Sequence, residues 1–147
     1  MAEPVGITGT AIAVAGLLYS TCKTTCEIIQ SFKDAPKEYH DLSADLNGLS
    51  TVLDSLQQAL RDTSDTVLSQ EQKDSLSELR FPLERCNASC SDFRNKLSAM
   101  TSHSDQNHTA VWDRLRLHFN RSDIGLLREK LGSTKGTVQI AIGVSTL

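Results

Sequence analysis

The N-terminal stretch of this chain constrains its possible folds more than any other feature. From Pro4 to Cys22 there is no charged side chain, and these 19 residues read PVGITGTAIAVAGLLYSTC. Their number is close to the roughly 20 that a helix needs to cross a bilayer core. Thr, Ser and Gly dilute the stretch, so it is too polar for a permanent membrane span. Two interpretations stay open: a core helix that remains in a soluble bundle, or a helix that leaves the bundle for a membrane.

Composition favours a soluble helical domain. The chain has 147 residues, of which 39% are apolar, 22% charged and only 5% aromatic. A core built from Leu, Val, Ile and Ala suits helices, and this length is typical of one domain. We predict a single domain over residues 1–147. Because the final VQIAIGVSTL carries no capping signal, we expect this domain to be the N-terminal part of a longer protein.

Charge excludes several classes of protein. The net charge is −3, with −6 on residues 1–77 and +3 on residues 78–147. A chain without a bulk basic footprint is not expected to bind nucleic acid. No Lys or Arg precedes Lys23, so the N-terminus does not look like a secretory signal. The four cysteines are therefore expected to be reduced thiols.

Apolar residues at alternating steps of three and four predict the helices. The first is expected over residues 7–32, and Pro36 opens the second. Ser69 and Gln72 fit a capping box at the start of a third helix, in which Pro82 predicts a kink rather than a split. The second helix carries the seam Leu42, Leu46, Leu49, Leu53, Leu56 and Leu60; the third carries Leu76, Leu79, Leu83, Cys86, Cys90, Phe93, Leu97 and Met100.

Two polar segments, residues 61–68 and 101–108, are expected to be a turn and a loop. A short helix over residues 109–119 should follow the second of them, and a last helix should begin near Asp123 after a break and cap at Asn120 and Ser122. We therefore predict an all-α antiparallel bundle of four long helices plus one short helix. The inward residues of the last two helices are Val111, Trp112, Leu115, Phe119, Ile124, Leu127, Leu131, Thr134, Val138 and Ala141.

The sequence offers little sign of catalysis. It has no glycine-rich phosphate loop and no nucleophile elbow, and its histidines lie in no metal motif, so we expect neither an enzyme nor a cofactor or metal. Cys22 and Cys26 are four residues apart, as are Cys86 and Cys90. A Cys₄ zinc site and a disulfide both stay open. Core packing is favoured because all four thiols fall at seam positions.

Three segments together resemble the HeLo-like domain of fungal signalling proteins. The first is PVGITGTAIAVAGLL, the second FKDAPKEYHDLSADLNGLSTVLDSL, and the third WDRLRLHFNRSDIGLLREKL, followed by an apolar tail. The resemblance covers nearly the whole chain. Such domains lie at the N-termini of fungal NOD-like receptors and of proteins that carry amyloid-forming motifs.

The resemblance implies a helical bundle that executes cell death in heterokaryon incompatibility or innate immunity, similar in action to the bundle of the mammalian necroptosis pseudokinase. On activation the domains come together, the N-terminal segment is released and the plasma membrane is permeabilised. The implied partners are membrane lipids, further copies of the chain, and an upstream receptor or amyloid-templating protein. The domain would be cytoplasmic at rest and at the plasma membrane when active.

Residues for membrane insertion follow from this resemblance, and an alternative remains. We expect a charge at Leu17 or Leu18 to harm both stability and membrane activity, and one at Thr8 or Thr10 to harm mainly the activity. The alternative function is a non-toxic interaction or oligomerisation adaptor of a signalling receptor. The expected insertion residues are Ile7, Ile12, Val14, Leu17 and Leu18.

Overall fold

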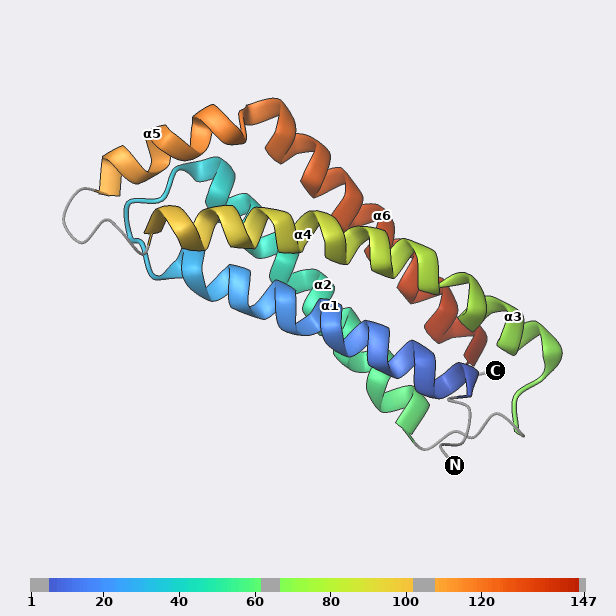
Figure 1. Ribbon diagram of the computed structural model, residues 1–147. Helices are drawn as coiled ribbons and strands as arrows, with labels where there is room; N and C mark the ends of the chain where they lie inside the picture. The colour runs from blue at the N-terminus through green and yellow to red at the C-terminus, as the bar shows by residue number, and fades with distance from the viewer. Residues whose placement is uncertain (1–5, 62–66, 102–107, 146–147) are drawn as a thin grey trace.

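The computed structural model describes residues 6–61, 67–101 and 108–145, and in these ranges the chain is all-α (Figure 1). The predicted helical bundle is thereby confirmed. The central residues of the expected turn and loop, 62–66 and 102–107, lie outside the described ranges. The helices are α1 (Ile7–Gln30), α2 (Lys37–Arg61), α3 (Gln70–Glu78), α4 (Arg80–Thr101), α5 (His108–His118) and α6 (Arg121–Ser145).

Side-chain caps define two of the helix starts. The predicted capping box is confirmed: the Gln72 backbone N–H donates to Ser69 Oγ at 3.1 Å, and the Ser69 N–H donates to Gln72 Oε1 at 2.8 Å. A second reciprocal pair opens α6, in which the Asp123 N–H donates to Asn120 Oδ1 and the Asn120 N–H to Asp123 Oδ2. Asn120 is therefore the cap, and α6 begins at Arg121 rather than near Asp123.

The predicted third helix is divided at Leu79 into α3 and α4. The Leu79 N–H bonds to the carbonyl of Leu76 at 3.2 Å, a tighter turn than an α-helix makes, and the Leu83 N–H returns to the carbonyl of Leu79 at 3.0 Å. Pro82 then lies in the first turn of α4, where its missing N–H leaves no internal bond unmade. The expected kink is thus a one-residue break. The seam continues across it, because Leu76, Leu79 and Leu83 are all buried.

The four long helices alternate in direction along the chain, but their spatial order around the bundle is α1, α2, α6, α4 (Figure 1). Helices α1 and α2 are antiparallel, as the contacts from Ile12 to Gln57 and from Cys26 to Ser43 require. Helix α1 runs parallel to α4, and α2 runs parallel to α6. Two of the four neighbouring pairs, α1 with α4 and α2 with α6, are therefore parallel. Helix α1 contacts both α2 and α4.

The bundle core is a single cluster of buried side chains. Most of the aromatic residues gather near the C-terminal end of α1 and α5: between ring centroids, Trp112 lies 4.8 Å from Tyr39 and 5.4 Å from Phe32. Met100 and Phe119 are only partly buried. The structure places all the expected core residues inside: Leu42, Leu46, Leu49, Leu53, Leu56, Leu79, Leu83, Cys86, Cys90, Phe93, Leu97, Trp112, Leu127 and Leu131.

Truncating the α2 seam should destabilise the bundle strongly. Leu49 has no exposed surface, so Leu49→Ala removes buried methyl groups and leaves a cavity. We expect the free energy of unfolding in urea to fall by about 2–5 kcal/mol. Leu126→Ala is the matched control because Leu126 is 62% exposed, and it should change this free energy by less than about 0.5 kcal/mol. Equal losses in the two variants would contradict this account of the core.

Candidate functional site

Helix α1 is the candidate functional element. Among the described residues it is the one helix long and apolar enough to cross a membrane, by length and composition alone. Of the 18 consecutive residues that form its most apolar segment, only 39% are buried in the bundle. The outer side of α1 carries no charge before Lys23, which is unusual for a surface helix, whose outer face normally carries charge along its length.

The buried face of α1 is a narrow stripe of small and medium side chains. Ala15, Leu18, Cys22 and Ile29 have no exposed surface, and α1 contacts both α2 and α4. Gly16 lies close to α2, where an added Cβ would stand 2.9 Å from the amide nitrogen of Gln57. A larger residue at position 16 would therefore require the end of the Gln57 side chain to move.

The five predicted insertion residues do not share one face. Leu18 points into the core, whereas Leu17 is 58% exposed. Ile7, Ile12 and Val14 are partly buried against the core. Four of the five residues are therefore partly or largely exposed at the surface of the bundle, and one, Leu18, is buried in its core.

The expected effects of charge in α1 need correction at two positions. Leu17 is largely exposed, so a charge there has no reason to destabilise the fold. Thr8 is 8% exposed and belongs to the buried set, so a charge there should destabilise it. The sequence pattern predicted a helix that is apolar on most of its circumference. A pattern of that kind does not show which side of the helix faces the core.

The hydroxyls on the buried face of α1 bond largely to their own helix. Thr25 Oγ1 donates to the carbonyl of Thr21 at 2.7 Å, and Thr21 Oγ1 lies 3.0 Å from the carbonyl of Leu17. Thr21 also contacts Asn87 Oδ1 of α4 at 2.8 Å. Polar groups that are satisfied within one helix keep their partners when that helix moves as a unit.

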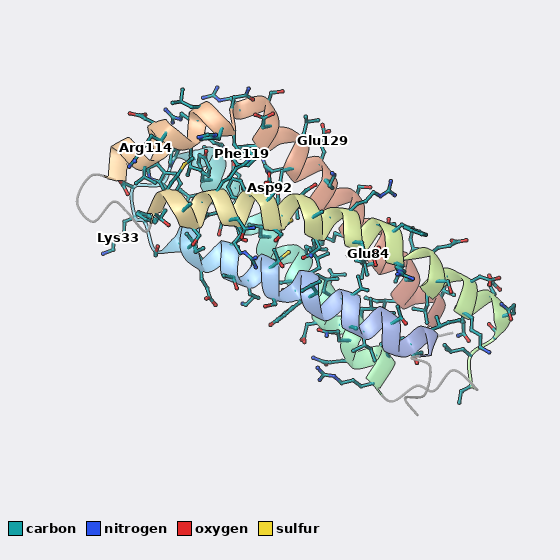
Figure 2. The ribbon with its side chains drawn as sticks, viewed as in Figure 1. Lys33, Glu84, Asp92, Arg114, Phe119 and Glu129 are labelled. Atoms are coloured by element: carbon teal, nitrogen blue, oxygen red, sulfur yellow. The ribbon has the colours of Figure 1, made fainter. Side chains whose placement is uncertain are left out.

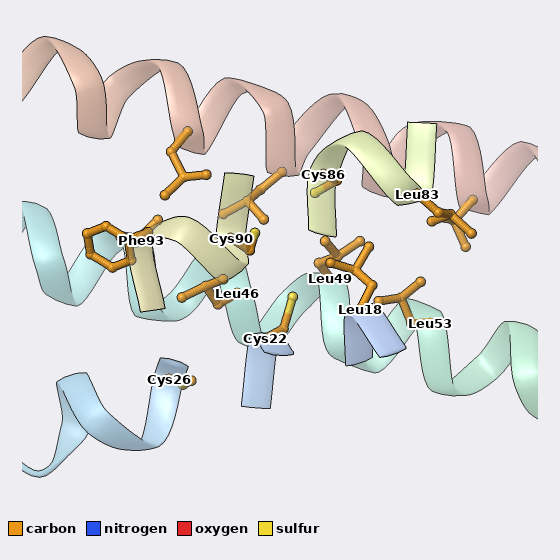
Figure 3. Close-up of a cluster of buried hydrophobic side chains, with 14 of the residues drawn as sticks. Leu18, Cys22, Cys26, Leu46, Leu49, Leu53, Leu83, Cys86, Cys90 and Phe93 are labelled. Carbon is orange, nitrogen blue, oxygen red and sulfur yellow. The ribbon is translucent and has the colours of Figure 1, made fainter. Parts of the chain in front are cut away.

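A cluster of thiols joins α1 to α4 (Figure 3). The Cys90 thiol is hydrogen-bonded to Cys22 and to Cys86. The bond to Cys22 and burial raise the pKa of Cys90 to about 12, against the bond to Cys86, which lowers it. The bond to Cys90 and burial also raise the pKa of Cys86. All four cysteines are free and buried, Cys26 contacting Ser43 of α2. Within the described ranges no group of three His, Cys, Asp or Glu side chains is arranged to hold a metal ion.

Ion pairs fasten α5 and α6 to the N-terminal half of α2. Arg128 Nε lies 2.6 Å from Asp45 Oδ2, and this bond raises the pKa of Arg128. Arg116 approaches Glu38 at 3.7 Å. Other charged side chains project outward around the bundle (Figure 2), such as Glu129. Exposed pairs of this kind contribute little stability individually.

A groove of about 290 Å³ lies between the N-terminal half of α1 and the α3–α4 junction. Phe81, on its edge, is 67% exposed. Phe81 was not predicted to be a functional residue, because it falls outside the leucine seam. Its position could have indicated an exposed site, because Phe81 is an apolar residue that lies between Arg80 and Pro82 and outside the apolar repeat of its helix. The lining residues are Ile7, Thr10, Ala11, Val14, Leu76, Ser77, Arg80, Phe81 and Leu83.

Comparison with known proteins assigns a family. Residues 2–147 match the family model described as the N-terminal region of the pigment biosynthesis cluster protein PigL. The chain belongs to this family. The match is consistent with a fungal HeLo-like helical domain but does not name one. No curated protein and no solved structure matched the chain.

A charge should lower the stability of the fold at Leu18 but not at the neighbouring Leu17. Leu18→Lys places an unpaired ammonium in the core and should lower the free energy of unfolding by several kcal/mol, about 3 or more. Leu17→Lys, on the exposed side, should change it by less than about 0.5 kcal/mol. Urea unfolding followed by circular dichroism measures both. Similar losses at the two positions would show that α1 is buried on both sides.

Tyr39 should make the fold sensitive to alkaline pH. Burial is the main cause that raises its pKa from 10.0 to about 12, and its hydroxyl has no partner within the described part of the chain. Above pH 10 the unfolded chain releases a proton that the folded chain retains, so stability is complete below pH 10 and falls as the pH rises toward 12. The loss specific to Tyr39 should be about 2 kcal/mol at pH 12.

The matched variant is Tyr39→Phe, which keeps the ring and removes the hydroxyl. We expect it to lose less stability than the wild type between pH 10 and pH 12, and to be at least as stable at pH 7, since it no longer buries an unpaired hydroxyl. Parallel pH profiles of the two proteins would rule out this role of Tyr39.

Proposed function

We propose that this chain is a membrane-permeabilising execution domain for regulated cell death in a fungal immune or incompatibility pathway. At rest it is a cytoplasmic bundle. On activation the copies assemble, α1 leaves the bundle, and it enters the plasma membrane. The resemblance to HeLo-like domains and the membership of a fungal N-terminal domain family support this proposal.

The hydrogen bonding of α1 is the observation that carries the proposal. Thr21 and Thr25 direct their hydroxyls to carbonyls of the same helix, so both keep a partner when α1 departs. The polar contacts that would break include those of Thr21 with Asn87, of Cys26 with Ser43, and of the Ile12 carbonyl with Gln57. In hydrocarbon each unsatisfied polar group costs several kcal/mol, so a helix that satisfies its own groups suits both environments.

The free energies of the two locations must be close for a switch to work. The buried stripe of α1 favours the bundle, whereas its outer side, which exposes Leu17 and carries no charge before Lys23, favours lipid. An equilibrium that lies within a few kcal/mol can be reversed by oligomerisation or by contact with a membrane. Gly9, Ala13 and Gly16 would then let copies of α1 pack closely within the bilayer, as small residues do in membrane helices.

Activation needs a partner that brings copies together. Self-association, driven by an upstream receptor or by an amyloid-templating protein, would supply the high local concentration. The first part of α1 has no basic residue before Lys23, so it attracts anionic lipid only weakly. In an assembly, the weak attraction of each copy would add to that of the others. Neither catalysis nor a cofactor takes part in this mechanism.

Leakage of dye from anionic liposomes tests the proposal. We expect the wild type to cause leakage, and Leu17→Lys to reduce it at least about tenfold, since a lysine in the middle of an inserted helix is costly. Ile140→Lys is the matched control, because Ile140 is 70% exposed on α6 and should leave leakage unchanged. Absence of leakage by the wild type at any concentration, or equal leakage by the two variants, would contradict the proposal.

Thiol labelling tests the release of α1 directly. Cys86 and Cys90 are buried beneath α1, with Cys90 bonded to Cys22, so a maleimide should react slowly with the resting protein. When liposomes cause leakage, we expect Cys86 and Cys90 to become labelled, as identified by mass spectrometry of peptides. Leakage with both thiols still protected would mean that α1 stays in the bundle.

The alternative function is a non-toxic adaptor domain. One observation favours it: α5 and α6 expose Leu117, Leu126 and Ile140, a set of large apolar side chains remote in sequence from α1. If this set carries the function, charges at Leu126 and Ile140 should abolish self-association or partner binding while the protein neither binds nor permeabilises liposomes.

A further inference from the structure

The groove between α1 and the α3–α4 junction is an unassigned apolar surface. Its walls come from two separate parts of the chain, with Ile7 and Val14 on one side and Leu76 and Leu83 on the other. Phe81 adds a ring that is 67% exposed on the edge of the groove. The remaining lining residues are small or polar, and Arg80 is the one charged side chain among them.

The apolar surface continues from the groove along the outer side of α1. Thr10, Val14 and Leu17 are spaced by four and three residues, which places them on one side of the helix. The first two line the groove, and Leu17 is 58% exposed. A contiguous exposed apolar surface of this kind marks a place where a soluble protein meets another molecule.

The charge at this surface favours an anionic occupant. Arg80 Nε donates to Glu84 Oε1 at 3.0 Å, and both side chains are largely exposed, at 59% and 45%. Pairs so exposed are weak, so a phosphate group can compete for the guanidinium, to which it binds with two parallel hydrogen bonds. An apolar slot of about 290 Å³ beside a guanidinium suits an acyl chain joined to an anionic headgroup.

We propose that this surface, formed by Ile7, Val14, Leu17, Phe81 and Arg80, docks the folded bundle on an anionic lipid membrane. Phe81 and Leu17 enter the boundary between headgroups and acyl chains, the groove receives part of an acyl chain, and Arg80 binds a headgroup phosphate. The surface is continuous with the helix that the proposed function sends into the membrane, which argues for lipid rather than a second protein as its occupant.

The inference rests on the proposed membrane function but concerns an earlier step. Docking takes place while α1 is still packed against α2 and α4, and it needs no exposure of Cys86 or Cys90. Phe81 and Arg80 belong to α4, so changes there test docking without altering the helix that inserts. Binding and leakage can therefore fail separately.

Vesicle co-sedimentation tests the docking surface. The probes are vesicles of phosphatidylcholine mixed with phosphatidylserine, and vesicles of phosphatidylcholine alone. Phe81→Ser should weaken binding to the mixed vesicles about tenfold, as loss of one inserted aromatic side chain would. Leu117→Ser is the matched control, because Leu117 is 85% exposed on α5, and its affinity should match that of the wild type.

A second variant keeps the test independent of Phe81. Arg80→Gln should weaken binding about fivefold on mixed vesicles and leave binding to phosphatidylcholine unchanged, since one basic residue contributes about that factor at an anionic surface. Cys86 and Cys90 should stay unreactive to maleimide in protein bound without leakage. Thermal unfolding should be the same for all variants, because each replaced side chain is largely exposed.

The inference is overturned if the wild type does not bind mixed vesicles, or if Phe81→Ser and Leu117→Ser bind equally. It is also overturned if Phe81→Ser dissociates a dimer in solution without changing vesicle binding, because the surface then belongs to a second copy. Binding that depends on Phe81 but never leads to leakage would support docking and reject the proposed pore. Leakage by a protein whose vesicle binding does not depend on Phe81 or Arg80 would support the proposed pore and reject this docking surface.

Discussion

The packing of one stripe of α1 between α2 and α4 is the interaction on which the rest of the structure depends. Ala15, Leu18, Cys22 and Ile29 have no exposed surface, and α1 contacts both α2 and α4. Leu18 and Cys22 lie in the core among leucines of α2 and residues of α4, with Cys22 hydrogen-bonded to Cys90 (Figure 3). Helices α2 and α4 stand at opposite corners of the bundle. Without α1 they would lose most of the partner surface that covers their seams, so removal of α1 would open the core.

This arrangement makes α1 both indispensable to the resting fold and suited to leaving it. Its buried hydroxyls bond to its own carbonyls, and its outer side offers no charged group before Lys23. Most other helices tie themselves to the bundle with ions or caps, as Arg128 ties α6 to Asp45 and Gln72 ties α3 to the carbonyl of Val144. Apolar packing, together with a few hydrogen bonds such as that of Thr21 with Asn87, holds α1 in place, and a bilayer can replace the apolar packing.

The fold could be predicted well from the sequence because its signals are repeated and local. The seams of α2 and α4 recur over several turns, and every seam residue from Leu42 to Leu60 is buried. Single-residue features were harder. Asn120 and Ser122 both suit a cap, and only the reciprocal bonds with Asp123 decide between them. The break at Leu79 depends on how the chain turns before Pro82 while keeping its seam in phase.

The sequence by itself determined that the chain is an all-α bundle whose first helix carries no charge up to Cys22, because hydrophobic periodicity and the placement of charge are properties of the chain alone. Only the tertiary structure decided which side of that helix is covered. Periodicity could not separate Leu17 from Leu18 in a helix apolar on most of its circumference, and the difference arises from the positions of α2 and α4. The same positions bring Phe81 and Arg80 beside Val14, since residues so distant in sequence meet only when α1 and α4 pack in parallel.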